Sequence, residues 1–334
     1  MQKPHKKVTM SEVALKAQVS KATVSRALGG SSLIGNEVRA HVEKVAEALG
    51  YVRKTQRRHA ERSILTVKVV LPPGKETSMQ LFYSFRSLLD GLRDGLKPSV
   101  ANVIVETYQN HYQPFPHKKG GEIDAFVFAF HRPSSRVLAE IQERGASCVV
   151  LNRIVRGVRQ VVSDHRDALY QIASHLGERG VKGNCCFVGY RGIEDVWRAR
   201  VQGFVEGCEA SGIEFEKERD CWLVSSPEGL TIEAVKAQYD LGVRNFIGVN
   251  DVVGIILMQQ LRRLDLRIPE DVRVTGCDRS PVYEITYPRL TSVDLSMKSL
   301  AREVGRSLQC EIVEKEKAKN VLLVKGALLI GETT

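Results

Sequence analysis

The stretch VTMSEVALKAQVSKATVSRALGG, residues 8–30, places two short segments with apolar residues at helical spacing around the break QVS. Ser20 stands just before the second segment, where its hydroxyl can cap a helix. Ala14 is small, as is needed where two helix backbones cross closely at a steep angle. The stretch predicts two short helices joined by a tight turn, with these residues inward: Met10, Val13, Ala14, Ala17, Val24, Ala27 and Leu28.

A third helix is predicted over GNEVRAHVEKVAEALGY, residues 35–51, with Gly50 as its stop. Its inward face would hold Val38, Val42, Val45, Ala46 and Leu49. Three helices over about 50 residues make a helix-turn-helix module, and a helix of this width fits the DNA major groove. The second helix would direct these side chains outward: Lys21, Ala22, Ser25 and Arg26. A helical hairpin without a nucleic-acid role is the alternative.

Positive charge is concentrated in this first part of the chain. Residues 1–62 hold 13 Lys and Arg against 5 Asp and Glu, whereas the whole chain of 334 residues carries a formal charge of +10. A basic tail in solvent would also give this imbalance, but apolar periodicity indicates that the segment folds. A folded module of that charge density is typical of a protein that binds a polyanion.

Composition describes an ordinary globular protein, with 43% hydrophobic residues and 11 prolines. No apolar run suits a signal peptide or a membrane helix, so we expect a cytoplasmic protein without a membrane partner. The seven cysteines include no C-x-x-C pair, and we expect them to be reduced core residues.

The segments VTMSEVALKAQVSKATVSRAL and VRAHVEKVAEALGYV resemble the headpiece of the lac repressor (LacI/GalR) family of bacterial transcription regulators, without a gap from Lys7 to Tyr51. The resemblance implies that Lys21, Ala22 and Arg26 read bases, with Met10 as an auxiliary contact. It also implies that Ser20, Thr23 and Ser25 position the helix on phosphates. Arg26 suits the base-reading role physically, because a guanidinium can donate to both O6 and N7 of guanine.

The turn and the hinge depart from the family. Gln18 stands where relatives usually have Gly or Asn, and a left-handed backbone there would cost about 1 kcal/mol. Residues 51–63 correspond to a hinge that in relatives inserts an apolar wedge, usually leucine, into the minor groove. Ala60 occupies the wedge position, while Lys54, Arg57 and Arg58 make the hinge basic and suited to phosphate or narrow-groove contacts. A solvated linker is the alternative for the free protein.

Beyond Ser63 the pattern becomes an alternation of strands and helices, which predicts parallel sheets of βαβ units. Expected strands are 65–71, 100–108, 123–130, 147–151, 184–188, 245–249 and 272–277. Expected helices include 81–96, 135–144, 167–179 and 197–211. A body of this kind could be an enzyme. The sequence nevertheless contains no phosphate loop, no G-x-G-x-x-G after the first strand, no H-E-x-x-H and no G-x-S-x-G, so we expect no enzyme, cofactor or metal.

The body also resembles the family's effector domain, in the stretches RARVQGF, IGVNDVVGIILMQQL, RIPEDVRVTGCDRS and PRLTSVDLS. That resemblance implies two doubly wound parallel-sheet lobes of periplasmic-binding-protein type with a ligand cleft between them. Arg200 would then anchor a carboxylate or hydroxyls. The implied effector-binding residues are Phe82, Asn152, Asp164, Arg200, Trp222, Asn250, Asp251 and Asp278. Asp164 and Asp251 could instead cap helices, and Trp222 could be core.

The expected organisation is an all-α helix-turn-helix headpiece (residues 1–50), a basic hinge (51–63) and an effector-binding and dimerisation core (64–334). Within the core, lobe 1 should cover about 64–162 plus 293–318, and lobe 2 about 163–292 plus 319–334. The segment QNHYQPFPHKKGGE, residues 109–122, leaves no room for the helix usual between its flanking strands, so lobe 1 should be trimmed there. The family default is a homodimer, and the sequence has no leucine-heptad tail for a tetramer.

Two functions remain open. In the first, the protein is a transcriptional regulator, expected to be a repressor, whose affinity for operator DNA is set by a small polar metabolite such as a sugar or sugar acid. The alternative is a cytoplasmic sugar-binding protein or enzyme with a vestigial DNA-binding module.

Overall fold

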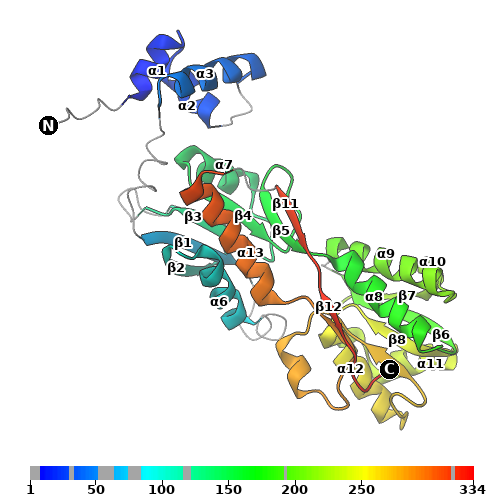
Figure 1. The fold of residues 1–334 in the computed structure, drawn as a ribbon. Coiled ribbons are helices and arrows are strands. Elements are labelled where there is room, and N and C mark those ends of the chain that lie inside the picture. Colours follow the sequence, from blue (N-terminus) through cyan, green and yellow to red (C-terminus); the bar gives the residue numbers. More distant parts are fainter. Residues whose placement is uncertain are drawn as a thin grey trace.

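The headpiece of the computed structural model consists of three helices (Figure 1): α1 (Met10–Lys16), α2 (Lys21–Leu28) and α3 (Asn36–Ala48). The structure describes residues 8–29, 34–51, 64–73, 84–115, 122–191, 194–316 and 320–334. Thr9 and Glu12 form a capping box at the start of α1, and the Ser20 hydroxyl accepts a hydrogen bond from the Thr23 amide at the start of α2. Local capping therefore fixes where both helices begin.

Most of the predicted headpiece core is confirmed. Val13, Ala14, Ala17, Val24, Ala27, Val42 and Ala46 are buried and form one cluster. Gln18 has a left-handed backbone, with φ of 54°, as expected for its place in the turn. Val38 was predicted to face inward, but 40% of it is exposed, because it lies in the first turn of α3, where the helix extends past the small core.

Lobe 1 is built on a six-stranded parallel sheet with the order β11-β5-β4-β3-β1-β2. Its strands are β1 (Ile64–Leu71), β2 (Val100–Thr107), β3 (Ala125–Ala129), β4 (Ser147–Leu151), β5 (Arg159–Ser163) and β11 (Val321–Val324). Two helices, α6 (Phe85–Leu96) and α13 (Met297–Gln309), pack on one face, and α7 (Ser135–Arg144) packs on the other. Predicted strands and helices match these elements with small shifts at their ends.

The connection between β2 and β3 contains no helix among its described residues, 108–115 and 122–124, as the trimmed segment predicted. Tyr112 and Phe115 from this connection cover the sheet instead, packing with Phe126 and Phe128. A hydrogen bond also holds this connection against β2, because the Tyr112 hydroxyl donates to Glu106 over 3.0 Å. Two aromatic side chains thus replace part of a missing helix layer.

Lobe 2 has a four-stranded parallel sheet with the order β7-β6-β8-β9. Its strands are β6 (Asn184–Tyr190), β7 (Cys221–Val224), β8 (Val243–Gly248) and β9 (Arg273–Thr275), and its helices are α8 (His165–Glu178), α9 (Glu194–Ser211), α10 (Lys217–Asp220), α11 (Ile232–Asp240) and α12 (Asp251–Arg263). The largest apolar cluster of the described residues fills this lobe. All seven cysteines are free, and four of them, Cys185, Cys186, Cys208 and Cys277, are buried.

Three chain segments connect the lobes, near residues 163–165, 294–297 and 324–327 (Figure 1). At the second and third, β10 (Ser292–Asp294) pairs antiparallel with β12 (Ala327–Leu329). The strand β11 pairs with β5 in lobe 1, whereas residues 319–334 were all expected in lobe 2. The apolar run VLLV suits the edge of either parallel sheet, so the sequence pattern could not decide between them.

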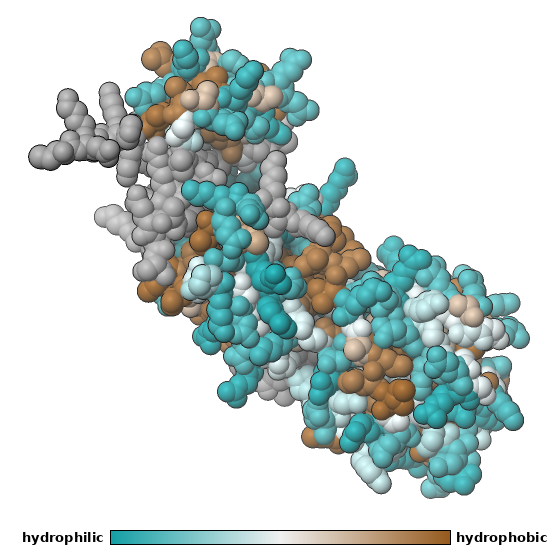
Figure 2. All heavy atoms as spheres, in the orientation of Figure 1, coloured by the Kyte–Doolittle hydropathy of each residue, from teal (hydrophilic) through white to brown (hydrophobic). Residues whose placement is uncertain are grey.

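The surface seen in Figure 2 is mainly hydrophilic, with apolar area over β11 and β12. Exposed side chains there are Val321, Leu323 and Ile330. No helix in the described part of the chain has the length and apolar character needed to span a membrane.

Candidate functional site

The outer face of α2 carries the side chains that were predicted to meet DNA. Lys21, Ala22, Ser25 and Arg26 are all exposed, while Val24 and Ala27 on the opposite face are buried. Because α2 begins with Lys21, the positive end of the helix dipole and an ammonium group lie together, an arrangement that favours a phosphate. This face is polar, cationic and narrow enough for the major groove.

Three other predicted contacts have more restricted settings. Ser20 and Thr23 are partly committed to capping α2, with their hydroxyl oxygens 2.9 Å apart. Met10 is partly buried against the headpiece core, so little of its side chain is available. The hinge residues predicted to bind DNA, namely Lys54, Arg57, Arg58 and Ala60, lie outside the described residues, as does the predicted effector residue Phe82.

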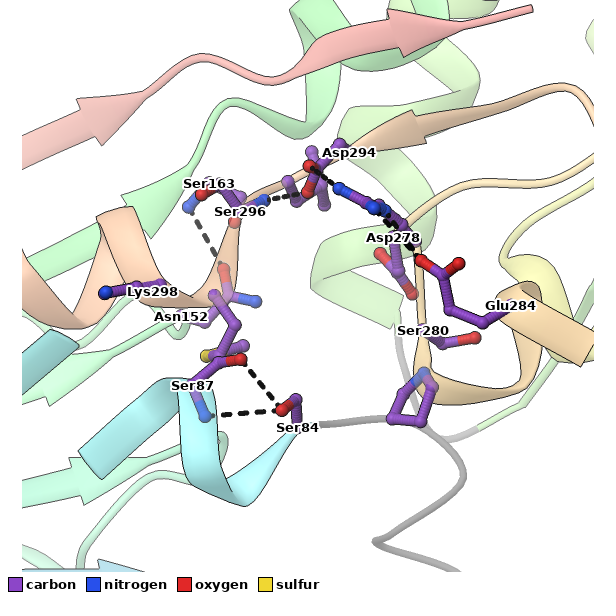
Figure 3. A pocket seen from close by; sticks show the side chains of 14 residues that line it. Ser84, Ser87, Asn152, Ser163, Asp278, Ser280, Glu284, Asp294, Ser296 and Lys298 are labelled. Atoms are coloured by element: carbon purple, nitrogen blue, oxygen red, sulfur yellow. Dashed lines mark hydrogen bonds and ion pairs between the residues drawn. The ribbon is translucent and has the colours of Figure 1, made fainter. Parts of the chain in front are cut away.

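A cavity of about 490 Å³ lies between the lobes, beside the crossover segments (Figure 3). Its walls come from the start of α6, the ends of β4 and β5, the loop after β9 and the second crossover. The lining residues are Ser84, Ser87, Asn152, Ser163, Asp278, Arg279, Ser280, Pro281, Glu284, Asp294, Leu295, Ser296, Met297 and Lys298. Carboxyl ends of parallel strands meet at such a position, where ligands bind in open α/β sheets.

Asn152 and Asp278 are the two predicted effector residues that line this cavity. The Asn152 side-chain oxygen accepts a hydrogen bond from the Ser163 amide over 3.1 Å. Both residues have positive φ angles, 57° for Asn152 and 112° for Asp278. Left-handed backbone at non-glycine residues is costly and concentrates at functional sites, which supports a binding role for this cavity.

Arg200 is buried behind the cavity and does not line it. Its guanidinium forms an ion pair with Asp278 and donates to the Val249 carbonyl oxygen. It also lies 3.1 Å from Nδ1 of His165, which must accept because arginine can only donate. Arg200 therefore holds Asp278 in place, rather than meeting a ligand directly.

Burial sets the protonation of this cluster. Burial, with the Arg200 charge beside it, holds the pKa of His165 well below its usual value, so the imidazole is neutral. Burial raises the pKa of Asp278, and the neighbouring Arg200 opposes that rise. The arrangement presents one carboxylate, anchored from behind by a guanidinium, to the cavity.

Asp251 is fully buried at the start of α12 and does not line the cavity. Its carboxylate accepts hydrogen bonds from the Ser280 amide, over 2.6 Å, and from the Ser292 hydroxyl. Burial, followed by repulsion from Asp278, raises its pKa to about 7. This placement favours a structural role that ties the loop after β9 to α12.

Three further predicted residues also lie outside the cavity lining. Asp164 caps α8, accepting from the Asp167 amide over 3.0 Å, and Asn250 caps α12 through the Val253 amide. Trp222 on β7 is partly buried against the core of lobe 2. The placements of Asp164 and Trp222 match the structural alternatives, whereas Asn250, rather than Asp251, is the residue that caps α12.

Sequence reasoning missed most of the serines and charged side chains of the cavity. The Ser163 hydroxyl is buried and has no hydrogen-bond partner in the described part of the chain. Arg279 and Ser296 have left-handed backbone, and Arg279 pairs with both Glu284 and Asp294 at the cavity wall. Their position in the sequence was the available signal, since Ser163 ends β5 and Ser296 follows β10, each at a crossover between the lobes.

The geometry defines a two-part protein: a DNA-binding helix-turn-helix headpiece joined to a two-lobed ligand-binding core. Comparison with known proteins supports both parts. Residues 9–54 match the bacterial regulatory proteins of the lacI family, and residues 173–334 match the periplasmic binding protein-like domain.

Full-length relatives have the same organisation. The HTH-type transcriptional regulator CelR of Thermobifida fusca is 25% identical over 97% of this chain and 98% of its own. A CelR-cellobiose complex matches with a TM-score of 0.65, 22% identity and coverage of 98% and 100%. A lac repressor dimer bound to operator matches with a TM-score of 0.61, 16% identity and coverage of 98% and 99%.

The chain therefore carries the DNA-binding domain of the lacI family of bacterial regulatory proteins, as its headpiece sequence indicated, together with a periplasmic binding protein-like domain, and is a DNA-binding transcriptional regulator.

Proposed function

We propose that this protein is a repressor that binds a pseudo-palindromic operator as a homodimer and responds to a sugar bound between its lobes. The observation that carries the proposal is the pairing of a cationic recognition helix with a polar cavity beside the crossovers between the lobes. Ligand binding there favours one angle between the lobes, and hence one spacing of the two headpieces. The cellobiose bound by CelR and the operator bound by the lac repressor dimer support this assignment.

The lining chemistry favours a neutral sugar. Hydroxyl groups of a sugar can donate to the carboxylates of Asp278 and Asp294 and can satisfy the buried Ser163 hydroxyl. No aromatic ring is among the described lining residues, so a purine would lack a stacking surface there. The two cations of the described lining are engaged by carboxylates, Arg279 by Glu284 and Asp294 and Lys298 by Asp94, which disfavours the carboxylate of a sugar acid.

The same observations support a non-enzymatic role. The relatives are transcriptional regulators rather than enzymes, and a protein that reads chromosomal DNA works in the cytoplasm. A sugar-binding protein or enzyme with a vestigial DNA module would keep the cavity but would not select a DNA sequence. Sequence-selective binding therefore separates the two functions.

The decisive experiment selects duplexes from a random pool with the full chain and then measures affinity for the selected duplex against neutral sugars, sugar acids and nucleosides. We expect a palindromic consensus and a change in affinity with one or more neutral sugars. Recovery of no consensus would contradict the regulator assignment. A response confined to nucleosides would contradict the assignment of the ligand class.

Arg26→Ala should weaken binding to the selected duplex by about 1–3 kcal/mol per half-site and relax one base position, because a bidentate guanine contact carries that discrimination. Lys44→Ala on α3 removes another exposed charge, from outside the recognition helix, and is the control. Equal weakening on all sequences by Arg26→Ala would place Arg26 on a phosphate instead.

A further inference from the structure

We propose that Asp195 forms a latch between the lobes: its contacts hold the two lobes at the angle seen in the structure. Through this latch, ligand binding in the cavity changes the DNA affinity of the headpiece. The effect of the latch on DNA affinity rests on the proposed function. Its effect on the angle between the two lobes does not.

The contacts of Asp195 cross from lobe 2 to lobe 1. Asp195 lies in the first turn of α9, and its Oδ2 accepts a hydrogen bond from Arg132, which follows β3, over 2.9 Å. The Nε of Arg132 also donates to the Ile154 carbonyl oxygen over 3.2 Å, which fixes the guanidinium on lobe 1. A second lobe 1 guanidinium, that of Arg153, has its Nε 4.0 Å from the same carboxylate oxygen.

The latch adjoins the cavity through Arg153. Its guanidinium donates to the carbonyl oxygen of Asn152 over 2.7 Å, and Asn152 lines the cavity. Arg153 also opposes the burial that raises the pKa of Asp278, so its charge acts across the cleft. A ligand that moves Asn152 therefore moves Arg153, and a ligand that neutralises Asp278 changes the electrostatic potential at Arg153.

The helix α9 joins the same two features from the lobe 2 side. Asp195 at its start contacts lobe 1, and Arg200 little more than one turn later holds Asp278 at the cavity wall. A shift of this helix relative to lobe 1 therefore displaces both the latch and the anchor of Asp278. Cavity and latch form one continuous set of contacts.

Chain connectivity does not enforce the Asp195 contacts. By contrast, two other ion pairs near the lobe boundary each include a residue of a crossover segment, so the chain itself keeps their partners near each other. These pairs are Lys325 with Asp167 at 2.6 Å and Arg279 with Asp294 at 3.0 Å. Asp195, Arg132 and Arg153 all lie outside the crossover segments, so their contact is lost when the lobes rotate apart. A contact present at only one lobe angle biases the equilibrium between angles.

The size of the bias follows from exposure. The side chain of Asp195 is 23% exposed, that of Arg153 15% and that of Arg132 56%, so solvent weakens the outer pair. Partly exposed ion pairs of this kind shift an equilibrium by about two- to five-fold.

The mechanical test uses hydrogen exchange of the full chain without DNA or ligand, comparing Asp195→Asn with the unaltered protein. We expect exchange in peptides covering 150–156 and 194–200 to rise by about two- to five-fold. Glu206→Gln, which breaks the Arg166–Glu206 pair between α8 and α9 inside lobe 2, is the matched control and should leave these peptides unchanged. Arg132→Gln should raise exchange in the same peptides, and adding it to Asp195→Asn should add little, because both changes break the same contact.

Equal exchange in Asp195→Asn and Glu206→Gln would overturn the latch, as would strictly additive effects of Asp195→Asn and Arg132→Gln. The coupling is tested with the selected duplex, for which Asp195→Asn should change affinity by a similar factor and Glu206→Gln should not. Faster exchange with unchanged duplex affinity would overturn the coupling. If the unaltered chain selects no duplex at all, the proposed function fails, while the exchange result still decides the latch.

Discussion

Replacement of Arg200 by methionine should destabilise lobe 2 because it leaves the Asp278 carboxylate partly buried without its partner. The Arg200 side chain is 3% exposed and that of Asp278 19% exposed, and the Val249 carbonyl loses its donor in the same change. Loss of one partner from a buried pair costs about 3–5 kcal/mol, whereas loss of both costs much less. Arg200→Met should therefore cost at least 3 kcal/mol, and adding Asp278→Asn should recover part of that loss.

The pH dependence has a definite sign. Burial already raises the folded pKa of Asp278, and loss of Arg200 removes the main charge that opposes this rise, so the folded pKa increases further. A carboxyl group with a raised folded pKa loses stability as the pH rises, so Arg200→Met should lose more at pH 8 than at pH 5. Urea unfolding followed by tryptophan fluorescence suits this test, because Trp197 and Trp222 both lie in lobe 2. A loss below about 1 kcal/mol, or strictly additive effects in the double variant, would refute the buried-pair reasoning.

Three other changes give separate tests. Gln18→Gly should stabilise the headpiece by about 1 kcal/mol, measured by thermal unfolding, because glycine adopts φ of 54° without the steric cost. Asp251→Asn should stabilise the protein more at pH 8 than at pH 5 in urea unfolding, since the raised pKa of about 7 makes ionised Asp251 unfavourable in the fold; equal effects at both pH values would contradict this. Ala60→Gly should reduce duplex affinity much less than Arg57→Ala combined with Arg58→Ala, because alanine offers too little apolar surface for a wedge. Circular-permutation gels should then report a mild bend. A strong kink would show that another residue serves as the wedge.

The exposed face of α2 could be predicted because a short helix in a small domain has only one inward side. Val24 and Ala27 must face the other helices, so Lys21 and Arg26 must face solvent. The left-handed backbone of Gln18 could be expected from the resemblance, since relatives usually have Gly or Asn at this place in the turn. Val38 was the exception, because periodicity predicts which side of a helix faces the core but not how far along the helix the core extends.

The parallel sheets and the trimmed β2–β3 connection also follow from local pattern and chain length. Assignment of β11 to lobe 1 does not, because an edge strand joins whichever parallel sheet the chain passes, and that path depends on the packing of both lobes.

The class of this protein follows from the residue pattern and the resemblance it carries: a basic helix-turn-helix, two parallel-sheet lobes and a polar site where strand ends converge. Which polar residues face the cavity depends on how the elements pack in three dimensions. Asn152 and Asp278 line it, while Arg200 and Asp251 are buried in support of the loop that carries Asp278. The physical reason is that capping, burial and ligand contact all select the same polar residue types at strand ends, and only the packing of neighbouring elements settles which of these roles each residue has.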